Sequence, residues 1–204
     1  MRRGFKAEAE RVAQTIRQEL GKSAADCLDA VELARHIGAE VRRADELTSL
    51  SKLRKLEEIQ PGSFSACTFT IGSRIVIVYN PLASAGRTQS DLAHEVSHLL
   101  LAHQMTVIQT LGSVRFFTCD PDQEQEANWL AGCLLLPRRL LYLAARRGLD
   151  GAEIAREYHV SGTMAAFRLR STGVVRQLEA EMGQRQARRK SGGSSVGRSE
   201  AGHS

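Results

Sequence analysis

Three residues in the stretch SDLAHEVSHLLLAH, residues 90–103, have types and a spacing that could do chemistry: His94, Glu95 and His98. In a helix, positions i and i+4 lie on one face, one turn apart, so the two histidines can direct their imidazoles at one cation. Glu95 is rotated by about 100° from His94. There a carboxylate can act as a general base toward water without ligating the metal. The pattern predicts a catalytic zinc site.

The surroundings of the motif favour a metal over ordinary hydrogen bonds. Two histidines and a glutamate in a buried helix are strongly destabilising if they are left unpaired. A bound cation removes that penalty. The neighbours that predict burial are apolar: Leu92, Ala93, Val96, Leu99 and Leu100.

A catalytic zinc needs a third protein ligand and an open fourth position. His103 is one residue short of the place of the third histidine in His-rich metalloproteases, and nothing in the pattern breaks the helix to bring it round. The better candidate is Glu126, in DQEQEANWLAGCLLLP, because the small Ala127 after it lets a neighbouring helix approach closely. Glu124 is expected to point elsewhere on the same helix, so Glu126 is the favoured ligand.

The elements that must position these residues follow from hydrophobic periodicity. The motif helix is expected to begin between Ser84 and Thr88 and to end at about Gln104. Alternating apolar residues on either side of Gly72-Ser73 predict an antiparallel hairpin. Residues 45–62 and 105–120 show no clear pattern. The other expected elements are helices over 5–20, 28–37, 121–135 and 138–147, and strands over 39–44, 63–71 and 74–80.

The order of helices, a small sheet and further helices predicts an α+β fold. The segment IAREYHVSGTMAAFRLRSTG then reads as two helices joined by a turn at Val160-Ser161-Gly162, similar to a helix-turn-helix. We expect a main domain over 1–148, this helical pair packed on it over 149–176, and a basic, Gly/Ser-rich disordered tail over 177–204.

Composition narrows the class of protein. The chain has 204 residues, of which 42% are hydrophobic and 25% charged, and a net charge of +5. These values fit one globular domain plus some disorder. No stretch is apolar enough for a signal peptide or a membrane span, which predicts a cytoplasmic protein without a membrane partner. The four cysteines, Cys27, Cys67, Cys119 and Cys133, form no CxxC pair and are expected to be reduced.

The motifs LAHEVSHLLL and EQEANWLAGCLLLP, after the strand RIVIVYN, resemble the ImmA/IrrE-type metallopeptidases, a zincin-like domain formerly of unknown function. The likeness covers about residues 7–175. Ser97 stands where the family often has Gly, and Leu130 where it often has Phe. The residues that fit the family pattern are Asn80, His94, Glu95, His98, Glu126, Ala127, Asn128, Ala131, Leu134, Leu135 and Pro137.

This resemblance implies a zincin-like α+β domain, with a small antiparallel or mixed sheet packed on the HExxH helix. It also implies a zinc ion, with Mn²⁺ as an alternative, held by His94, His98 and Glu126, and Glu95 as the catalytic base. Family members typically cleave a helix-turn-helix repressor and so release stress-response or mobile-element genes. The expected partner is therefore a protein substrate of that kind.

Two other functions stay open. One is a DNA-binding regulator with a structural zinc, for which Arg168 and Arg170 on the second helix of the pair and the basic tail argue, although the apolar pattern there also suits simple packing. The other is a module that binds a repressor without cleaving it. The residue that stabilises the oxyanion is not selected by the sequence; the candidates are Tyr79, His103, Tyr142 and His159.

Overall fold

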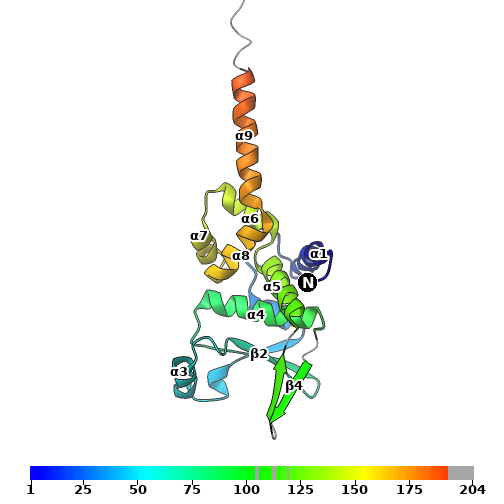
Figure 1. Ribbon diagram of the computed structural model, residues 1–204, viewed down its shortest axis with the longest axis vertical. Helices are drawn as coiled ribbons and strands as arrows, with labels where there is room; N and C mark the ends of the chain where they lie inside the picture. Colours follow the sequence, from blue (N-terminus) through cyan, green and yellow to red (C-terminus); the bar gives the residue numbers. More distant parts are fainter. Residues whose placement is uncertain (104–105, 112–113, 119, 193–204) are drawn as a thin grey trace, which may run out of the picture.

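The computed structural model describes residues 1–103, 106–111, 114–118 and 120–192 (Figure 1). Its order of elements is the expected α+β arrangement. The elements are α1 Phe5–Glu19, α2 Ala30–His36, β1 Ala39–Arg43, the 3₁₀ helix η1 Ala44–Glu46, α3 Leu50–Ile59, β2 Ala66–Ile71, β3 Arg74–Tyr79, α4 Ala85–Leu100, β4 Thr106–Leu111, β5 Val114–Thr118, α5 Pro121–Leu135, α6 Arg138–Arg146, α7 Gly151–Glu157, α8 Gly162–Thr172 and α9 Val174–Gly192.

The sheet is small and mixed, with the strand order β1-β3-β2. β1 runs parallel to β3, whereas β2 is antiparallel to β3 and pairs Thr68 with Ile77. The predicted hairpin is confirmed. Gly72 has φ +63° at its turn, a left-handed conformation that glycine adopts without strain. In the order β1-β3-β2, the strand β2 lies at one edge of the sheet.

Side chains of β3 alternate between two apolar clusters, as the pleat of a strand requires. Ile77 points into the main core, while Val76 and Val78 pack with Leu53 of α3 in a smaller cluster. Residues 45–62 show no clear pattern in the sequence, and in the structure they contain the end of η1 and all of α3. Helix α3 is amphipathic, and its single buried residue, Leu53, holds it on the sheet.

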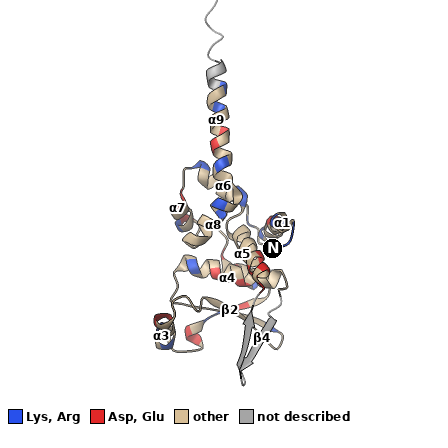
Figure 2. Cartoon of the chain, in the orientation of Figure 1, with Lys and Arg blue, Asp and Glu red and all other residues tan. Residues whose placement is uncertain are grey.

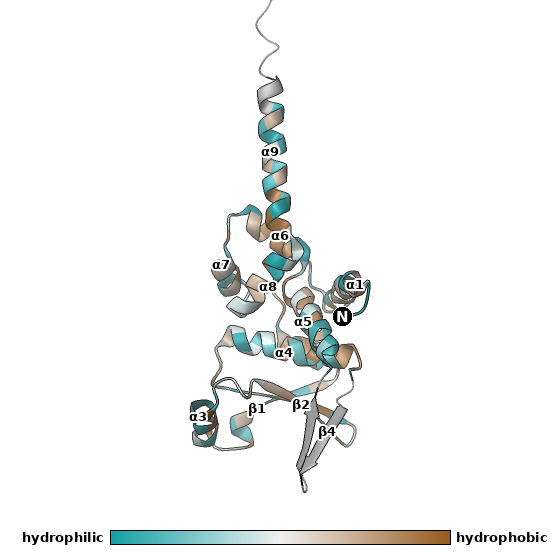
Figure 3. Cartoon of the chain, viewed as in Figure 1, coloured by the Kyte–Doolittle hydropathy of each residue, from teal (hydrophilic) through white to brown (hydrophobic). Residues whose placement is uncertain are grey.

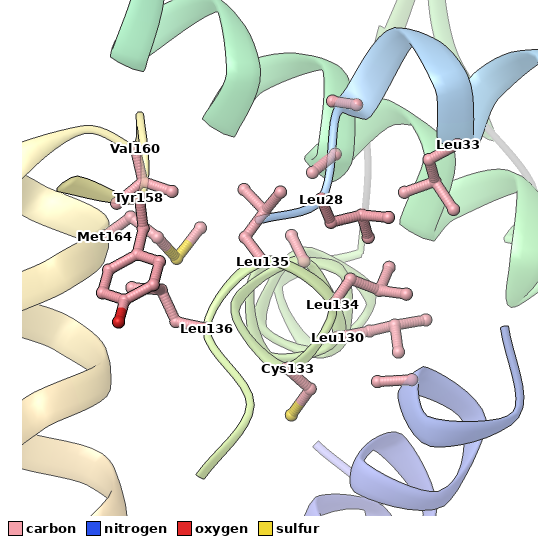
Figure 4. Close-up of a cluster of buried hydrophobic side chains, with 14 of the residues drawn as sticks. Leu28, Leu33, Leu130, Cys133, Leu134, Leu135, Leu136, Tyr158, Val160 and Met164 are labelled. Atoms are coloured by element: carbon pink, nitrogen blue, oxygen red, sulfur yellow. The ribbon is translucent and has the colours of Figure 1, made fainter. Parts of the chain in front are cut away.

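Helix α5 runs through the main core, which explains its nearly continuous apolar run (Figure 4). From Glu126 onward almost every side chain is buried, and neighbouring elements surround the helix. Its N-terminal turn is polar: Asp120 caps it and accepts from the Asp122 N–H. The polar end of α5 thus carries the carboxylates, while the apolar end anchors the helix. The buried residues of α5 beyond Glu126 are Ala127, Trp129, Leu130, Ala131, Gly132, Cys133, Leu134 and Leu135.

Helix α4 lies between the sheet and α5 (Figure 1). Ser84 caps it by accepting from the Arg87 N–H. Near its start, Gly86 passes so close to the α7–α8 turn that a Cβ there would lie 2.5 Å from the carbonyl oxygen of Val160. Ser90 Oγ accepts from the Ser161 N–H at 2.9 Å, which fixes the same contact. The motif helix is thereby joined to the helix-turn-helix-like pair.

The C-terminal segment differs from the prediction. A disordered tail was expected from residue 177, but helix α9 continues to Gly192 and projects away from the body (Figure 1). Hydrogen bonds from Arg138 to Gln177 and from Tyr142 to Glu181 hold its first turns on α6. Beyond Glu181, α9 is mostly hydrophilic, and its charged residues are all basic: Arg185, Arg188, Arg189 and Lys190 (Figures 2 and 3). Residues 193–204 lie outside the described part of the chain.

Residues 105–120, which had no sequence assignment, contain the antiparallel pair β4 and β5. Cys119 lies outside the described residues. No helix within the described ranges is long and apolar enough to cross a bilayer.

Candidate metal centre

The side chains of His94 and His98 meet on one face of α4, as their spacing predicts. Their Nε2 atoms are 3.0 Å apart. The carboxylate of Glu124, in the first turn of α5, lies against both: Oε2 is 3.3 Å from His94 Nε2, and Oε1 is 3.3 Å from His98 Nε2. Among the described residues these three groups place their ligand atoms within 4.8 Å of one another.

Asn128 determines which nitrogen of His94 carries the hydrogen. Its Nδ2 donates to the backbone carbonyl of Glu124 at 2.8 Å, so its Oδ1 is the atom that faces His94 Nδ1 at 3.2 Å. Nδ1 must therefore be the donor, and Nε2 keeps its lone pair. That lone pair points at His98 and Glu124.

His98 is oriented from behind by His103. The two Nδ1 atoms are 3.0 Å apart, and the other nitrogen of His103 faces a carboxylate oxygen of Glu126 at 3.7 Å. Because the Nε2–H of His103 points at the Glu126 carboxylate, Nδ1 of His103 has a free lone pair. It therefore accepts a hydrogen bond from the Nδ1–H of His98. Burial lowers the pKa of both rings, that of His98 to about 4 with help from the nearby His94, so both are neutral at pH 7.

The backbone explains how His103 reaches this position. The sequence suggested that no residue breaks the helix after His98. In the structure α4 ends at Leu100, and Ala102 adopts a left-handed conformation with φ +50°. The chain turns back, and the His103 N–H donates to the carbonyl of His98 at 3.0 Å. A non-glycine residue there is strained by about 1 kcal/mol.

The structure does not bring Glu126 to the paired histidine nitrogens. Its carboxylate accepts from the backbone N–H of Arg2 at 2.8 Å and from Arg2 Nε at 3.2 Å. Burial alone would raise the pKa of Glu126, but the Arg2 contacts outweigh it and the pKa lies below its usual value. Residues two apart on a helix point about 200° apart, so Glu124 and Glu126 cannot both face α4 in the same way.

Glu95 lies beside the paired histidines and is held by the sheet. Thr68 Oγ1, on the edge strand β2, donates to Glu95 Oε2 at 2.6 Å. This contact ties the motif helix to β2. It fixes one carboxylate oxygen and leaves Oε1 available to accept a proton.

Other residues singled out in the sequence have different positions. Arg168 is fully buried, donates to the carbonyl of Leu136 and pairs with Glu10 at 2.7 Å, so it cannot contact DNA. Arg170 is exposed. Of the oxyanion candidates, Tyr142 donates to Glu181 and His103 is engaged with His98.

The donor set fits a divalent cation. Three lone-pair-bearing groups face one another at 3.0 to 3.3 Å with no hydrogen between them, which is repulsive unless a cation lies among them. Two neutral imidazoles and one carboxylate are ligands that zinc prefers. Asn128 and His103 supply the second hydrogen bond that metal-ligating histidines usually make.

The sequence contains a pattern that points to Glu124 as a ligand, but it involves polar residues and is not seen in the spacing of the apolar ones. Glu124 and Asn128 are four residues apart, so they stack on one face of α5. A carboxylate followed one turn later by an amide can present a ligand and an orienting group to the same histidine.

An HExxH helix against an edge strand, with a facing carboxylate from the next helix, defines a metallopeptidase site. The model of the IrrE N-terminal-like domain, peptidase family M78, matches residues 56–170. This is more than half of the chain, and the chain belongs to that family. The resemblance found in the sequence is thereby confirmed. A search of curated proteins found no match.

Proposed function

We propose that the chain is a zinc-dependent endopeptidase in which His94, His98 and Glu124 hold the cation and Glu95 is the general base. The observation that carries this proposal is the convergence of the three ligand groups beside a carboxylate that Thr68 orients. Mn²⁺ is the alternative ion. The bound cation supplies a Lewis acid that polarises the peptide carbonyl and makes water more acidic.

The remaining steps belong to the residues of the chain. Glu95 Oε1 takes a proton from the attacking water as the water oxygen bonds to the carbonyl carbon. The same proton passes to the amide nitrogen when the C–N bond breaks, and Glu95 is restored. Thr68 holds the second oxygen of Glu95, so the carboxylate keeps one orientation through both transfers.

The edge strand β2 offers a place for the substrate backbone. Its outer side pairs with no other strand in the part of the chain that the structure describes. An extended peptide can add to such an edge through backbone hydrogen bonds. Because Thr68 of β2 contacts Glu95, a peptide bound there would lie next to the base.

Three zinc-loaded proteins test this assignment: wild type, Glu95→Gln and, as a matched control, Glu58→Gln on the exposed face of α3. We expect all three to retain zinc, as measured by mass spectrometry of the metal. Glu95→Gln should cleave a protein substrate at least about 10²-fold more slowly, and Glu58→Gln at the wild-type rate. Cleavage by Glu95→Gln at the wild-type rate would show that Glu95 is not the base.

The proposed substrate is a helix-turn-helix transcriptional repressor, whose cleavage would derepress stress-response or mobile-element genes. The support for it is the resemblance to the ImmA/IrrE-type peptidases. The test is incubation with any helix-turn-helix repressor encoded near the gene of this chain, with and without a chelator, and mass spectrometry of the products. Fragments that appear only without chelator are expected. An intact repressor under both conditions would exclude this substrate.

A further inference from the structure

A cavity of about 790 Å³ begins at His94 and Glu124 and is lined by residues of α4, α5 and α8. Trp129, Met164 and Phe167 form its apolar part. The Trp129 and Phe167 rings meet edge to face, with centroids 5.6 Å apart. An apolar, aromatic-lined hollow next to a catalytic centre is suited to a side chain of the bound substrate.

The cavity is lined by three basic residues and two carboxylates, of which Glu124 faces the histidines and Asp91 faces Arg87. Of its three basic residues, Arg87 is paired with Asp91 at 2.8 Å. Lys6 lies 4.3 Å over the Trp129 ring and, like Arg170, has no carboxylate partner among the described residues. Two uncompensated positive charges beside an apolar hollow favour a ligand with an acidic group next to an apolar one.

Helix α8 supplies much of this wall. Met164, Phe167 and Arg170 follow one another at intervals of three, which places them along one side of the helix, and all three line the cavity. In a DNA-binding helix-turn-helix this second helix would enter the major groove. Here one side of α8 faces the hollow beside the metal centre, and its other arginine, Arg168, is buried.

We infer that this cavity is a specificity pocket, and that it selects a substrate segment in which an aromatic or large apolar residue is adjacent to an acidic one. The inference rests on the proposed peptidase function and adds the substrate class. The apolar side chain packs against Trp129 and Phe167, and the carboxylate pairs with Arg170 and Lys6. The helix-turn-helix-like pair is thus a substrate-reading element.

Binding can be measured without catalysis. Trp129 is the only tryptophan of the chain, so its fluorescence reports on the cavity. Zinc-loaded Glu95→Gln protein is titrated with acetyl-Ala-Phe-Glu-Ala-amide and with the matched acetyl-Ala-Phe-Lys-Ala-amide. We expect the acidic peptide to bind at least about tenfold more tightly.

Charge reversal identifies the residues responsible. Adding Arg170→Glu, or Lys6→Glu, should abolish or reverse the preference between the two peptides. Arg176→Glu, the same change at an exposed position of α9 outside the cavity, should leave it unaltered. Equal binding of both peptides, or a preference that survives Arg170→Glu and Lys6→Glu, would overturn the inference. So would a fluorescence change with a DNA duplex and with neither peptide, which would assign α8 to DNA.

Cleavage of a proteome-derived peptide library by the zinc-loaded wild-type protein separates this inference from the proposed function. Enrichment of an apolar-acidic pair on one side of the cut sites, lost in Arg170→Glu, supports both. Cleavage without that enrichment leaves a peptidase and removes the specificity pocket. Selective peptide binding without any cleavage leaves the pocket and removes the peptidase.

Discussion

The two histidines of the candidate metal centre, His94 and His98, are alike in chemistry and differ in surroundings. His94 lies on the open side: it lines the large cavity, and Glu124 beside it is 38% exposed. His98 lies on the closed side, backed by His103 and Glu126, whose side chains are 8% and 5% exposed. The contrast suggests that one half of the site admits the substrate, while the other half fixes the geometry of the ligands.

The same contrast accounts for the two glutamates of α5. Glu124 is on the open side with the ligand atoms, whereas Glu126 is on the closed side with Arg2 and His103. A carboxylate held by an arginine cannot turn toward a cation without breaking that pair. We therefore assign ligation to Glu124 and orientation to Glu126 in the proposed site.

The largest expected effect tests this division directly. Glu124→Gln removes a ligand and should lower zinc affinity by more than the 10–100-fold that is typical of losing an outer partner of a ligand. Glu126→Gln should stay within that 10–100-fold range. Competition with a chromogenic chelator measures both affinities. A larger loss for Glu126→Gln would reverse the assignment.

The outer partners of the two histidines allow a second comparison. His103→Phe removes the acceptor behind His98, and Asn128→Ala removes the one behind His94. Each should weaken zinc binding by roughly 10–100-fold. Only Asn128 lines the cavity, so at saturating zinc Asn128→Ala should also raise the KM for peptides, whereas His103→Phe should not. Equal KM changes would mean that the two sides are not functionally distinct.

A smaller effect is expected for Thr68→Val, which keeps the shape of the side chain and removes its hydroxyl. A hydrogen bond to a charged group contributes about 1.5 kcal/mol or more, so kcat should fall by at least roughly tenfold while zinc affinity is unchanged. Steady-state kinetics and the chelator assay measure the two quantities. A loss of zinc affinity equal to that of Glu124→Gln would indicate that Thr68 acts on the metal ligands.

The smallest effect on activity is expected for a change at Cys133, in the core on which the site rests, because it alters stability at alkaline pH. Burial raises the pKa of the Cys133 thiol to about 12, above its ordinary value of 9.0. The unfolded chain therefore loses this proton first, and stability should fall as the pH rises from about 9 toward 12, by at most about 1.4 kcal/mol per pH unit. Denaturant unfolding should show a shallower alkaline decline in Cys133→Ala than in wild type. An identical decline would show that Cys133 is not responsible.

Much of the fold was predictable because its signals are local. The spacing of His94 and His98, the turn at Gly72 and the apolar pattern of α5 each act within a few residues of the chain. The choice between Glu124 and Glu126 as the metal ligand could not be predicted from local sequence, because it depends on how α5 is rotated against α4. That rotation is set by contacts across the core and by Arg2, more than 120 residues earlier in the chain.

The remaining differences have similar causes. The position of His103 depends on the left-handed backbone at Ala102, which alanine does not favour by itself. The start of α9 is held by the contacts of Gln177 and Glu181 with α6, which stabilise a helix that its polar composition would not stabilise alone. In each case tertiary contacts decided a conformation that local sequence preferences left undetermined.

Because Gly86 has only a hydrogen atom as its side chain, helix α4 can pass very close to the α7–α8 turn. A methyl group at this position would clash with the Val160 carbonyl oxygen, which is the nearest atom to it. Gly86→Ala would push the α7–α8 turn outward and so widen or tilt one wall of the cavity, while leaving every metal ligand in place. Gly86→Ala would then change the substrate preference, although Gly86 itself contacts neither the substrate nor the metal.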